Sequence, residues 1–525
     1  MEKSVYRKVT IAALIMMASV FLSRVIGLVR EMVIAGVGGT QAPVDAYQVA
    51  FVIPEILNHV VASGFLSITF IPIFTGYLAK GREAEGWRVF SIILTLFGGI
   101  LVLLIAVAWV FAAPLLSLAA PGFTHSPHFD QAVTMLRIIL PGQFFFFCGG
   151  LFMAVQFAKE SFTIPALAPL VYNLGIIIGG LIGGSQHSMV GFAWGVLGGA
   201  FAGSFCLQLA GAVRAGMRFV PALDLKHPDL KRYIVLTIPL MLGLTMTFST
   251  EVLFRFFGSY LPGGSIAGLN YALRVMFIVV GLVGQAVGVA SYPFMARLVA
   301  EERLGELSDL LNKLLRYLAI TIPISVLVII LRYEIVLVLF QRKAFTPAST
   351  ALTAEALAFL MVGAFAFSAQ TVVARGFYAM QNTLLPAVYG TIAVLLSLPL
   401  YILGLQWMGI NGVALACALS ATVQVGVLFA VWNRKRDNQT GRTVYRAIFK
   451  FLSISVVLGI FAFAVRAAMS QAVDPRTFAG SCIILAVTGG LSLVFLAGAG
   501  YVLRIAEIMT VLDRLARKVK RNGGQ

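Results

Sequence analysis

Charged residues are scarce in this sequence. Only 11% of its 525 residues are Asp, Glu, Lys or Arg, whereas 60% are hydrophobic. Soluble globular domains carry about 25% charged residues, so the composition excludes an ordinary soluble protein. The mean hydropathy of +0.95 indicates a chain whose helices are surrounded by lipid. We therefore predict a membrane protein.

Cysteine is also scarce, and the signature of a nucleotide-binding loop is missing. The four cysteines lie within apolar segments at no paired spacing, so we expect neither disulfides nor a metal site; they are Cys148, Cys206, Cys417 and Cys482. The sequence contains no GxxxxGK[ST] motif, which argues against ATP hydrolysis by this chain. We expect no cofactor and no bound nucleotide, with energy from an ion gradient or from consumption of the substrate downstream.

Long apolar segments are abundant. A helix needs about 20 apolar residues to cross a bilayer, and segments of at least about 18 residues qualify as candidate spans. The first segment continues past Arg24 without a small-residue cleavage site, so it is predicted to be a retained helix and not a signal peptide. The fourteen predicted spans are 9–37, 44–79, 87–119, 129–158, 163–183, 188–213, 230–260, 264–297, 307–340, 350–379, 384–405, 410–432, 443–469 and 478–506.

Basic residues favour one set of connections. Connections after even-numbered spans carry lysines and arginines, such as Lys80, Arg82 and Arg88, whereas those after odd-numbered spans are nearly free of charge. Arg342 and Lys343 are the exception. The positive-inside rule then predicts that both termini lie in the cytoplasm. The net charge of +18 is mostly this topological signal plus attraction to anionic membrane lipids, and its spread over separate connections argues against nucleic-acid binding.

The chain also repeats itself. Matching Pro and Gly residues recur at a single offset of 221 residues (293 − 72, 386 − 165 and 412 − 191); the pairs are Pro72 with Pro293, Pro165 with Pro386, and Gly191 with Gly412. A shared offset at three separated places predicts two homologous six-helix lobes in the same orientation, as in parallel-repeat transporters. We expect an N-terminal lobe over residues 1–222, a C-terminal lobe over 223–437, and helices 13 and 14 with a basic cytoplasmic tail over 438–525. The predicted fold is an all-α polytopic membrane protein with 14 transmembrane helices, arranged as two pseudo-symmetric lobes plus two C-terminal helices.

Ionisable residues inside the apolar segments point to the functional site. A charge within the membrane costs roughly 2.5–3.5 kcal/mol on insertion scales and persists mainly where it faces a cavity or a partner. Equivalent helices of the two lobes hold these residues, so we expect them to line a mixed but cationic cleft between the lobes. They are Arg24, Arg30, Glu31, Asp45, Glu55 and His59 in the first lobe and Glu251, Arg255 and Arg274 in the second.

Helical spacing pairs several of these charges. Arg24 and Glu31 are seven residues apart and share one helix face, so Glu31 can hold Arg24. Neighbours at i,i+4 also face each other, and these are Glu251 with Arg255 and Glu55 with His59. Arginine in a partly dry cleft suits a phosphate or pyrophosphate, because its planar fork donates paired hydrogen bonds.

A simpler interpretation competes with this one. The paired charges could only neutralise each other, and Arg30 could extend to the outer membrane interface. A lone histidine such as His59 is more often a hydrogen-bonded core residue than a ligand.

Several short sequence motifs are distinctive enough to compare with known families. Ser23-Arg24-Val-Ile-Gly-Leu-Val-Arg30-Glu31, Asp45-Ala-Tyr and Phe65-Leu-Ser-Ile-Thr-Phe-Ile-Pro72 stand in the first half, and Phe345-Thr346, the segment 375–383 with Pro386, and the segment 409–416 stand in the second. Together they span essentially the whole chain and resemble the MurJ (MviN) lipid II flippases. That family belongs to the multidrug/oligosaccharidyl-lipid/polysaccharide exporter superfamily.

The resemblance implies a transporter and not an enzyme. It would move undecaprenyl-pyrophosphate-linked peptidoglycan precursor, lipid II, from the cytoplasmic to the outer leaflet of the bacterial inner membrane by alternating access. Helices 13 and 14 would hold the polyprenyl tail. The expected substrate-binding residues are Ser23, Arg24, Arg30, Glu31, Asp45, Asn58, His59 and Arg274, and the expected gating or coupling residues are Glu55, Glu251 and Arg255.

The second helix departs from the family pattern. The family typically has two basic residues and then Glu before a Gly, but Asn58, His59 and Ser63 stand at these positions, and Glu55 comes one turn earlier. Lys343 stands where a Gly is usual. Because the second helix helps to line the headgroup site, these departures leave open a flippase for another undecaprenyl-linked glycan, such as an O-antigen or exopolysaccharide unit.

Two other classes of function fit less well. A cation-coupled drug exporter would favour acids over arginines in its cavity. A scaffold for cell-wall enzymes would not explain why charges recur on equivalent apolar helices.

Overall fold

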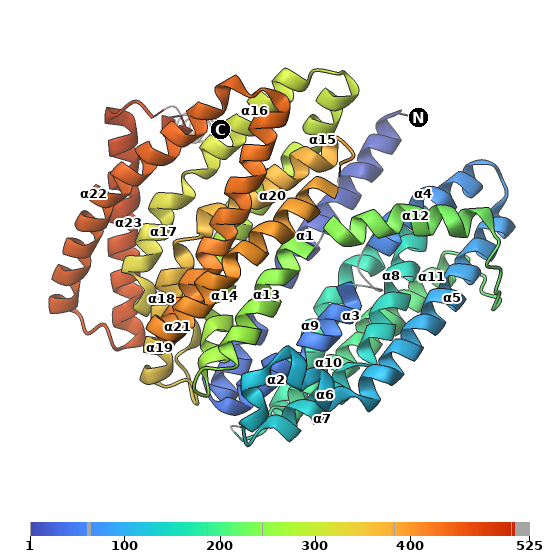
Figure 1. Ribbon diagram of the computed structural model, residues 1–525, viewed down its shortest axis with the longest axis horizontal. Coiled ribbons are helices and arrows are strands. Elements are labelled where there is room, and N and C mark those ends of the chain that lie inside the picture. Colours follow the sequence, from blue (N-terminus) through green and yellow to red (C-terminus); the bar gives the residue numbers. More distant parts are fainter. Residues whose placement is uncertain are drawn as a thin grey trace. The chain divides into compact units, whose positions relative to one another are not determined.

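The computed structural model describes residues 2–59, 65–185, 187–243, 245–382, 384–505 and 507–509 (Figure 1). These residues form helices joined by short turns, and this part of the chain contains no β-strand. The all-α prediction is therefore confirmed. Ser63 and the predicted basic tail after residue 509 lie outside the described residues.

Nine of the described helices are long and apolar enough to cross a membrane, judged by length and composition. The count is ten if α19 (Pro347–Met361) and α20 (Ala364–Ala379), which meet at a bend of 48°, form one span. One of the nine, α21 (Leu384–Arg436), contains the non-helical residue Gly409 with φ of +56° and therefore comprises two successive helices. The polytopic membrane architecture is confirmed, and the number of fourteen spans stays a prediction.

The chain folds into two compact units. The first comprises Met1–Ala267 with Arg342–Phe345. Its helices are α1 (Glu2–Gly38), α2 (Ala42–Ala50), α3 (Val52–Leu57), α4 (Phe65–Ala79), α5 (Glu83–Val110), α6 (Ala112–Ala119), η2 (Pro121–His125), α7 (Phe129–Ile139), α8 (Gly142–Ala158), α9 (Thr163–Gly183), α10 (Val190–Gly199), η3 (Ala200–Leu207), α11 (Gln208–Arg214), α12 (Pro228–Gly243), α13 (Thr245–Gly258) and the opening turn of α14 (Ser265–Val280).

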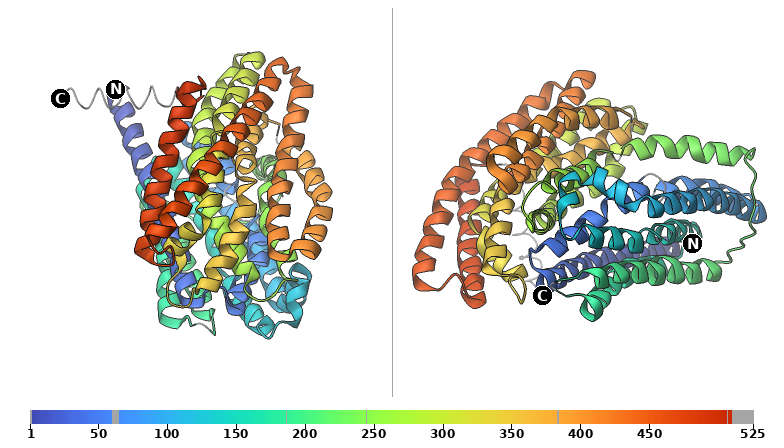
Figure 2. Two further views of the ribbon diagram at one scale, coloured as in Figure 1. Left: turned by 90° about the vertical axis from the view of Figure 1, so that its left-hand side faces the viewer. Right: turned by 60° about the horizontal axis from the view of Figure 1, so that its bottom comes forward.

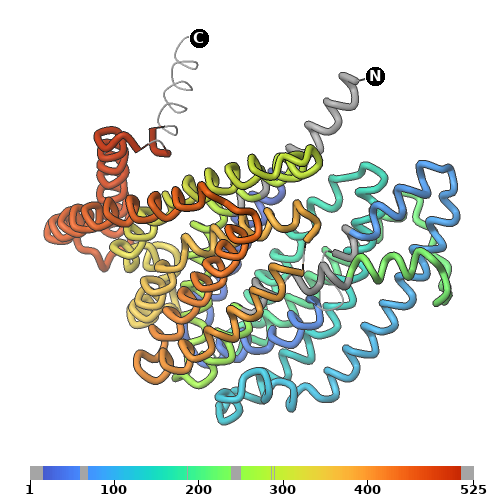
Figure 3. Tube along the Cα trace, turned by 45° about the horizontal axis from the view of Figure 1, so that its top comes forward, coloured from blue at the N-terminus to red at the C-terminus, as the bar shows by residue number. Residues whose placement is uncertain are grey.

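The second unit comprises Gly268–Gln341 and Thr346–Gln525. It contains the rest of α14, η4 (Gly281–Gln285), α15 (Ala286–Ala300), α16 (Leu304–Leu318), α17 (Thr321–Ile330), α18 (Arg332–Phe340), α19, α20, α21, η5 (Gln439–Gly441), α22 (Arg442–Ala472) and α23 (Phe478–Val502). The last two helices form a hairpin, drawn in red at the end of the chain, and α22 also packs along α17 (Figures 2 and 3).

The helix boundaries repeat at the offset found in the sequence. Helices α4 and α15 end at Ala79 and Ala300, and helices α5 and α16 begin at Glu83 and Leu304, so both boundaries are 221 residues apart (300 − 79 and 304 − 83). The turns repeat as well: three pairs of residues at this offset share a positive φ, namely Gly81 with Glu302, Glu160 with Gln381, and Gly216 with Asp437. The internal repeat predicted from the sequence thus extends to helix boundaries and to single turns.

The repeat and the compact units divide the chain at different places. Helices α12 and α13 are the repeat of α1, yet they pack within the first unit. There the hydroxyl groups of Thr69 and Thr237 lie 3.0 Å apart, and Tyr77 donates a hydrogen bond to Asp229. The lobes at residues 1–222 and 223–437 describe homology, and their boundaries stay a prediction.

Glycine allows one pair of helices to approach closely in each unit. A Cβ on Gly191 in α10 would lie 2.2 Å from the carbonyl carbon of Gly183 in α9, and a Cβ on Gly412 would lie 1.9 Å from the carbonyl oxygen of Gly404. Helices in a membrane associate through such small-residue contacts because lipid provides no hydrophobic force between them. The glycine match in the sequence therefore reports a packing constraint that both units share.

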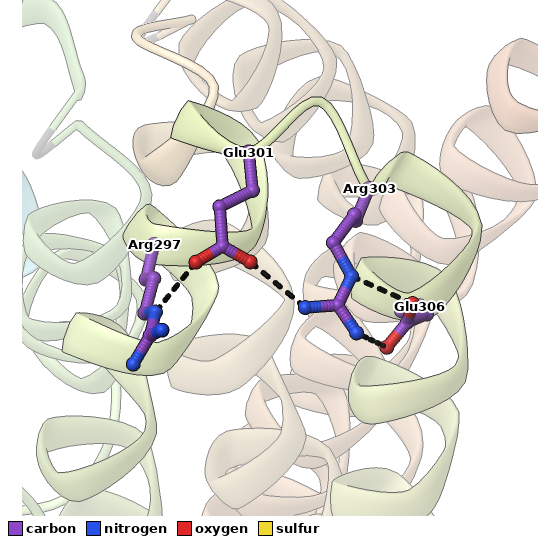
Figure 4. Close-up of polar contacts among 4 residues, drawn as sticks. All are labelled: Arg297, Glu301, Arg303 and Glu306. Atoms are coloured by element: carbon purple, nitrogen blue, oxygen red, sulfur yellow. Dashed lines mark hydrogen bonds and ion pairs between the residues drawn. The ribbon is translucent and has the colours of Figure 1, made fainter.

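The turn before α16 shows how the repeat conserves a polar contact. Arg303 lies 2.7 Å from Glu306 and 2.8 Å from Glu301, which also accepts a hydrogen bond from Arg297 at 2.6 Å (Figure 4). The hydrogen bonds from Arg297 and then Arg303 lower the pKa of Glu301. Arg82 and Glu85 form the equivalent ion pair before α5, so both turns are fixed in the same way.

Candidate functional site

Arg30 is the centre of a polar cluster within the apolar helix α1. Its Nη2 atom lies 2.5 Å from Oε1 of Glu31, and its Nη1 atom donates to Oδ1 of Asn173 in α9 at 3.0 Å. Asn173 in turn donates to the carbonyl oxygen of Pro169 at 2.8 Å, which orients its amide. Glu31 is only 4% exposed, and a carboxylate buried without a partner is costly. Arg30 thus compensates Glu31.

A second cluster surrounds Arg255 in α13, which is 1% exposed. Its guanidinium contacts both carboxylate oxygens of Glu55 in α3, with Nη2 to Oε1 at 3.1 Å. It also lies 3.9 Å from Oε2 of Glu251, one turn earlier in α13, and 5.3 Å from the ring centroid of Phe254. Glu31 adds a favourable electrostatic interaction with the same guanidinium. Three carboxylates therefore act on the positive charge of Arg255.

Asp45 in α2 caps the start of another helix. It is 2% exposed, and its carboxylate accepts hydrogen bonds from the backbone N–H groups of Gly264 at 2.5 Å and Ala267 at 2.7 Å. These groups at the start of α14 have no partner within the helix, and an anion is favoured there. Gly264 has φ of +93°, and a Cβ on it would lie 2.1 Å from the carbonyl oxygen of Thr40. Only glycine fits this approach.

Several connections meet around this cap. The N–H of Gly122 donates to Oγ of Ser259 at 3.1 Å, and the N–H of Ala344 donates to the carbonyl oxygen of Gly36 at 3.1 Å. A cavity of about 310 Å³ beside Asp45 is lined by residues of the turns 121–127 and 258–263. Thr40 and Ala344 lie in two more such segments, so the connections after the first, third, seventh and ninth predicted spans lie together.

The remaining expected residues are placed as follows. Ser23 is half-buried and Arg24 is exposed on α1. Asn58 and His59 follow α3 and are half-buried. Arg274 lies in the part of α14 that belongs to the second unit and is half-buried. The structure thus brings together Arg30 with Glu31, and Arg255 with Glu55 and Glu251.

Two features of these clusters do not follow from the sequence. Asn173 was not expected, although an amide within the apolar segment 163–183 is a signal that could have identified it. The contact between Glu55 and Arg255 joins residues 200 positions apart, and helical spacing cannot reveal such a pair.

Comparison with known proteins settles the family. The model of the family described as "Lipid II flippase MurJ" matches residues 34–487. The chain belongs to the MurJ lipid II flippase family. The resemblance inferred from the motifs is therefore confirmed, and the chain is a multi-pass membrane protein of a bacterial flippase family.

Individual relatives agree with this assignment. The chain is 28% identical over 523 residues to the "Probable lipid II flippase MurJ" of Rhizobium tropici, a match that covers 95% of this chain and 94% of that protein. It is 27% identical over 445 residues to the protein of the same name from Vibrio cholerae serotype O1, which covers 82% and 83% of the two chains.

Solved structures show the same fold. "Lipid II flippase MurJ, inward closed conformation" superposes with a TM-score of 0.75 at 22% identity, over 93% of this chain and 99% of that one. A multidrug resistance MATE family transporter of the MOP superfamily superposes with a TM-score of 0.64 at 11% identity, over 81% and 96% of the two chains. The fold is thus shared with MurJ and, more distantly, with other exporters of this superfamily.

Proposed function

We propose that this chain is a transporter that moves lipid II from the cytoplasmic to the outer leaflet of the bacterial inner membrane, with both termini in the cytoplasm. The observation that carries the proposal is the match of the lipid II flippase family model to residues 34–487. Relatives that bear this name align with up to 96% of the chain, so the match is not confined to one part of it. On this proposal the side chains bind and release the substrate without forming a covalent bond to it.

The pyrophosphate and the peptide carboxylates would be bound by Arg24, Arg30 and Arg274. Arg30 already compensates Glu31 at 2.5 Å, so a phosphate that binds there replaces one anion by another. Glu31, which such an exchange would displace, keeps its favourable electrostatic interaction with Arg255, and this interaction lowers the cost of its burial away from Arg30. Hydrogen bonds to the sugar and peptide would come from Ser23, Asn58, His59 and the newly identified Asn173.

Gating would depend on two sets of buried polar contacts in the first unit. The cap that Asp45 forms on Gly264 and Ala267 joins α2 to the start of α14, and a hydrogen bond that involves a charged group contributes about 1.5–3 kcal/mol. The Glu55, Glu251 and Arg255 cluster joins α3 to α13. We propose that release toward the outer leaflet requires the Asp45 cap to open. Glu31 interacts with Arg30 and with Arg255, so substrate binding at Arg30 would change the electrostatic environment of the Arg255 cluster.

The proposal is tested by complementation of a bacterial strain whose own lipid II flippase can be shut off. The quantity to measure is the fraction of lipid II that an impermeant lipid II-degrading enzyme can reach from outside the cell. We expect this fraction to fall when the resident flippase is depleted and to recover when this chain is expressed. Growth with no recovery of accessible lipid II would contradict the substrate assignment.

The unusual second helix favours one alternative, a flippase for another undecaprenyl-linked glycan. A triple variant with Arg at Asn58 and His59 and Glu at Ser63 restores the family pattern. If the substrate is lipid II, this variant should still complement, because it re-routes the charges within the same site. Rescue by the triple variant but not by the native chain would favour the other glycan.

A further inference from the structure

A polar cavity of about 360 Å³ lies in the second unit, apart from every residue discussed above as part of the substrate site. It is enclosed by α16, by the start of α22 with η5, and by the residues that follow α23. Its walls carry charges of both signs, namely Asp309, Lys313, Arg316 and Glu507.

The wall that contains Glu507 is fixed by tertiary contacts. Arg504, with φ of +48°, turns the chain back after α23. Ile505 and Ile508 then pack in a buried cluster with Phe451 of α22. The Nη2 and Nε atoms of Arg316 lie 2.5 Å and 2.7 Å from Oε1 of Glu507. The cavity is therefore a built feature, with one wall formed by the residues that follow α23.

The opposite wall is a hydrogen-bonded network. Asn312 donates to Asn438 and to Thr440, both at 2.8 Å, and Thr440 donates to Oδ1 of Asp309 at 2.8 Å. These bonds hold the start of α22 against α16 and orient the carboxylate of Asp309. The polar groups of the wall are thus positioned before any ligand binds.

Three charged groups of the cavity retain binding capacity. Within the part of the chain that the structure describes, Lys313 has no hydrogen bond or ion pair, and only one carboxylate oxygen of Asp309 accepts a bond. Arg316 is 36% exposed and keeps Nη1 available beside its contact with Glu507. A ligand that fits must therefore present a negative group to Lys313 and Arg316 and a positive group to Asp309.

The cavity lies where apolar and basic surfaces meet. Tyr445 and Phe449 on α22 are 53% and 72% exposed, and Tyr501 and Val502 at the end of α23 are 68% and 77% exposed. Exposed apolar side chains of this kind suit lipid tails, and tyrosine favours the headgroup level of a membrane. The basic residues 434–436 form the last turn of α21, two residues before η5, and are typical of the cytoplasmic interface. The opening is thus within reach of a phospholipid headgroup.

We propose that this cavity binds the headgroup of phosphatidylethanolamine. The phosphate lies against Lys313 and Arg316, and the ethanolamine ammonium donates to Asp309. The two bases and two acids of the cavity sum to zero, which matches a zwitterion, whereas a purely anionic headgroup would place its charge near Asp309 and Glu507. A choline headgroup matches the charges but has no N–H to donate.

The test uses the purified full-length chain in detergent with equal amounts of phosphatidylethanolamine, phosphatidylglycerol and phosphatidylcholine, and native mass spectrometry to count retained lipids. We expect phosphatidylethanolamine to be retained about tenfold more tightly than the other two, because a charge-assisted hydrogen bond is gained. Asp309→Asn and Lys313→Gln should each remove most of this preference. Both side chains are exposed, so the fold should tolerate these variants.

Lys450→Gln is the matched control, because Lys450 is an exposed base of α22 outside the cavity. It should retain the preference for phosphatidylethanolamine in full. Equal retention of the three lipids, preferential retention of phosphatidylglycerol, or equal loss in the control variant would each overturn the proposal. None of these outcomes depends on whether lipid II is the transported substrate.

Discussion

Removing Glu55 should destabilise the protein more than removing its partner Arg255, although both changes break the same ion pair. The reason is the difference in exposure: Arg255 is 1% exposed at its side chain, Glu55 is 28% exposed and Glu251 is 31% exposed. In Glu55→Gln, a fully buried guanidinium loses its nearest carboxylate and keeps Glu251 at 3.9 Å and the weaker interaction with Glu31. In Arg255→Met, the carboxylates that remain can bind water.

The expected magnitudes follow from this asymmetry. Loss of one member of a buried pair costs about 3–5 kcal/mol, and because Glu251 remains we expect about 3 kcal/mol for Glu55→Gln. For Arg255→Met we expect about 1.5 kcal/mol, which includes about 0.5–1 kcal/mol for the lost contact with the ring of Phe254. The double variant should cost less than Glu55→Gln alone, since it leaves no buried guanidinium.

The assay is unfolding of the purified protein in detergent micelles, followed by tryptophan fluorescence. Glu85→Gln is the control, because the Arg82–Glu85 pair is exposed at 55% and 47%, and such pairs contribute at most about 1 kcal/mol. If Arg255→Met proves as costly as Glu55→Gln, or if the two costs add in the double variant, then burial of Arg255 does not decide the energetics of the cluster.

Three further outcomes are expected. Arg24→Ala and Arg274→Ala should each abolish complementation while membrane insertion stays intact. Lysine at either position should rescue only partly, because it lacks the planar guanidinium that donates paired hydrogen bonds. Full activity of both alanine variants would refute a role for these arginines in binding. Gly412→Ala should lower the free energy of unfolding by about 1–3 kcal/mol, because its Cβ would lie 1.9 Å from the carbonyl oxygen of Gly404. The control Gly426→Ala, whose Cβ meets nothing within 4 Å, should leave the free energy of unfolding unchanged. Similar losses for the two variants would exclude close packing as the cause. An impermeant thiol reagent applied from outside should label cysteines introduced after odd-numbered spans, at Thr40, Ser126 and Ser185. It should not label cysteines introduced after even-numbered spans, at Arg82, Arg218 and Asn438. Reversed labelling would overturn the proposed orientation.

The internal repeat was the part of the fold that the sequence predicted in most detail. Prolines and glycines at one offset located the equivalent helices, because each of these residues is tied to a specific backbone geometry. The structure extends the same offset to helix ends and to left-handed turn residues such as Glu160 and Gln381, which no residue type marks. Packing contacts and not local preference hold these residues in a conformation that is unusual for them.

The candidate site was predicted as a set of residues but not as a set of contacts. Glu251 and Arg255 are near each other as their spacing requires, yet Arg255 makes its closer contacts with Glu55 in another helix. The partners of Asp45 are backbone N–H groups of Gly264 and Ala267, and a sequence contains no sign of which N–H groups a carboxylate will cap. Asn173 was missed because one amide in an apolar helix has no periodicity of its own.

The sequence by itself determined that the chain is an α-helical membrane transporter with a duplicated architecture and with charges inside its apolar helices. These properties are local, since apolar length, charge placement and repeat spacing are all read along the chain. Only the tertiary structure decided which charges compensate one another: Arg30 with Glu31 and Asn173, Arg255 with Glu55, and Asp45 with the start of α14. Compensation falls steeply with distance, and the distances between helices that are 200 residues apart are set by packing and not by spacing along the chain.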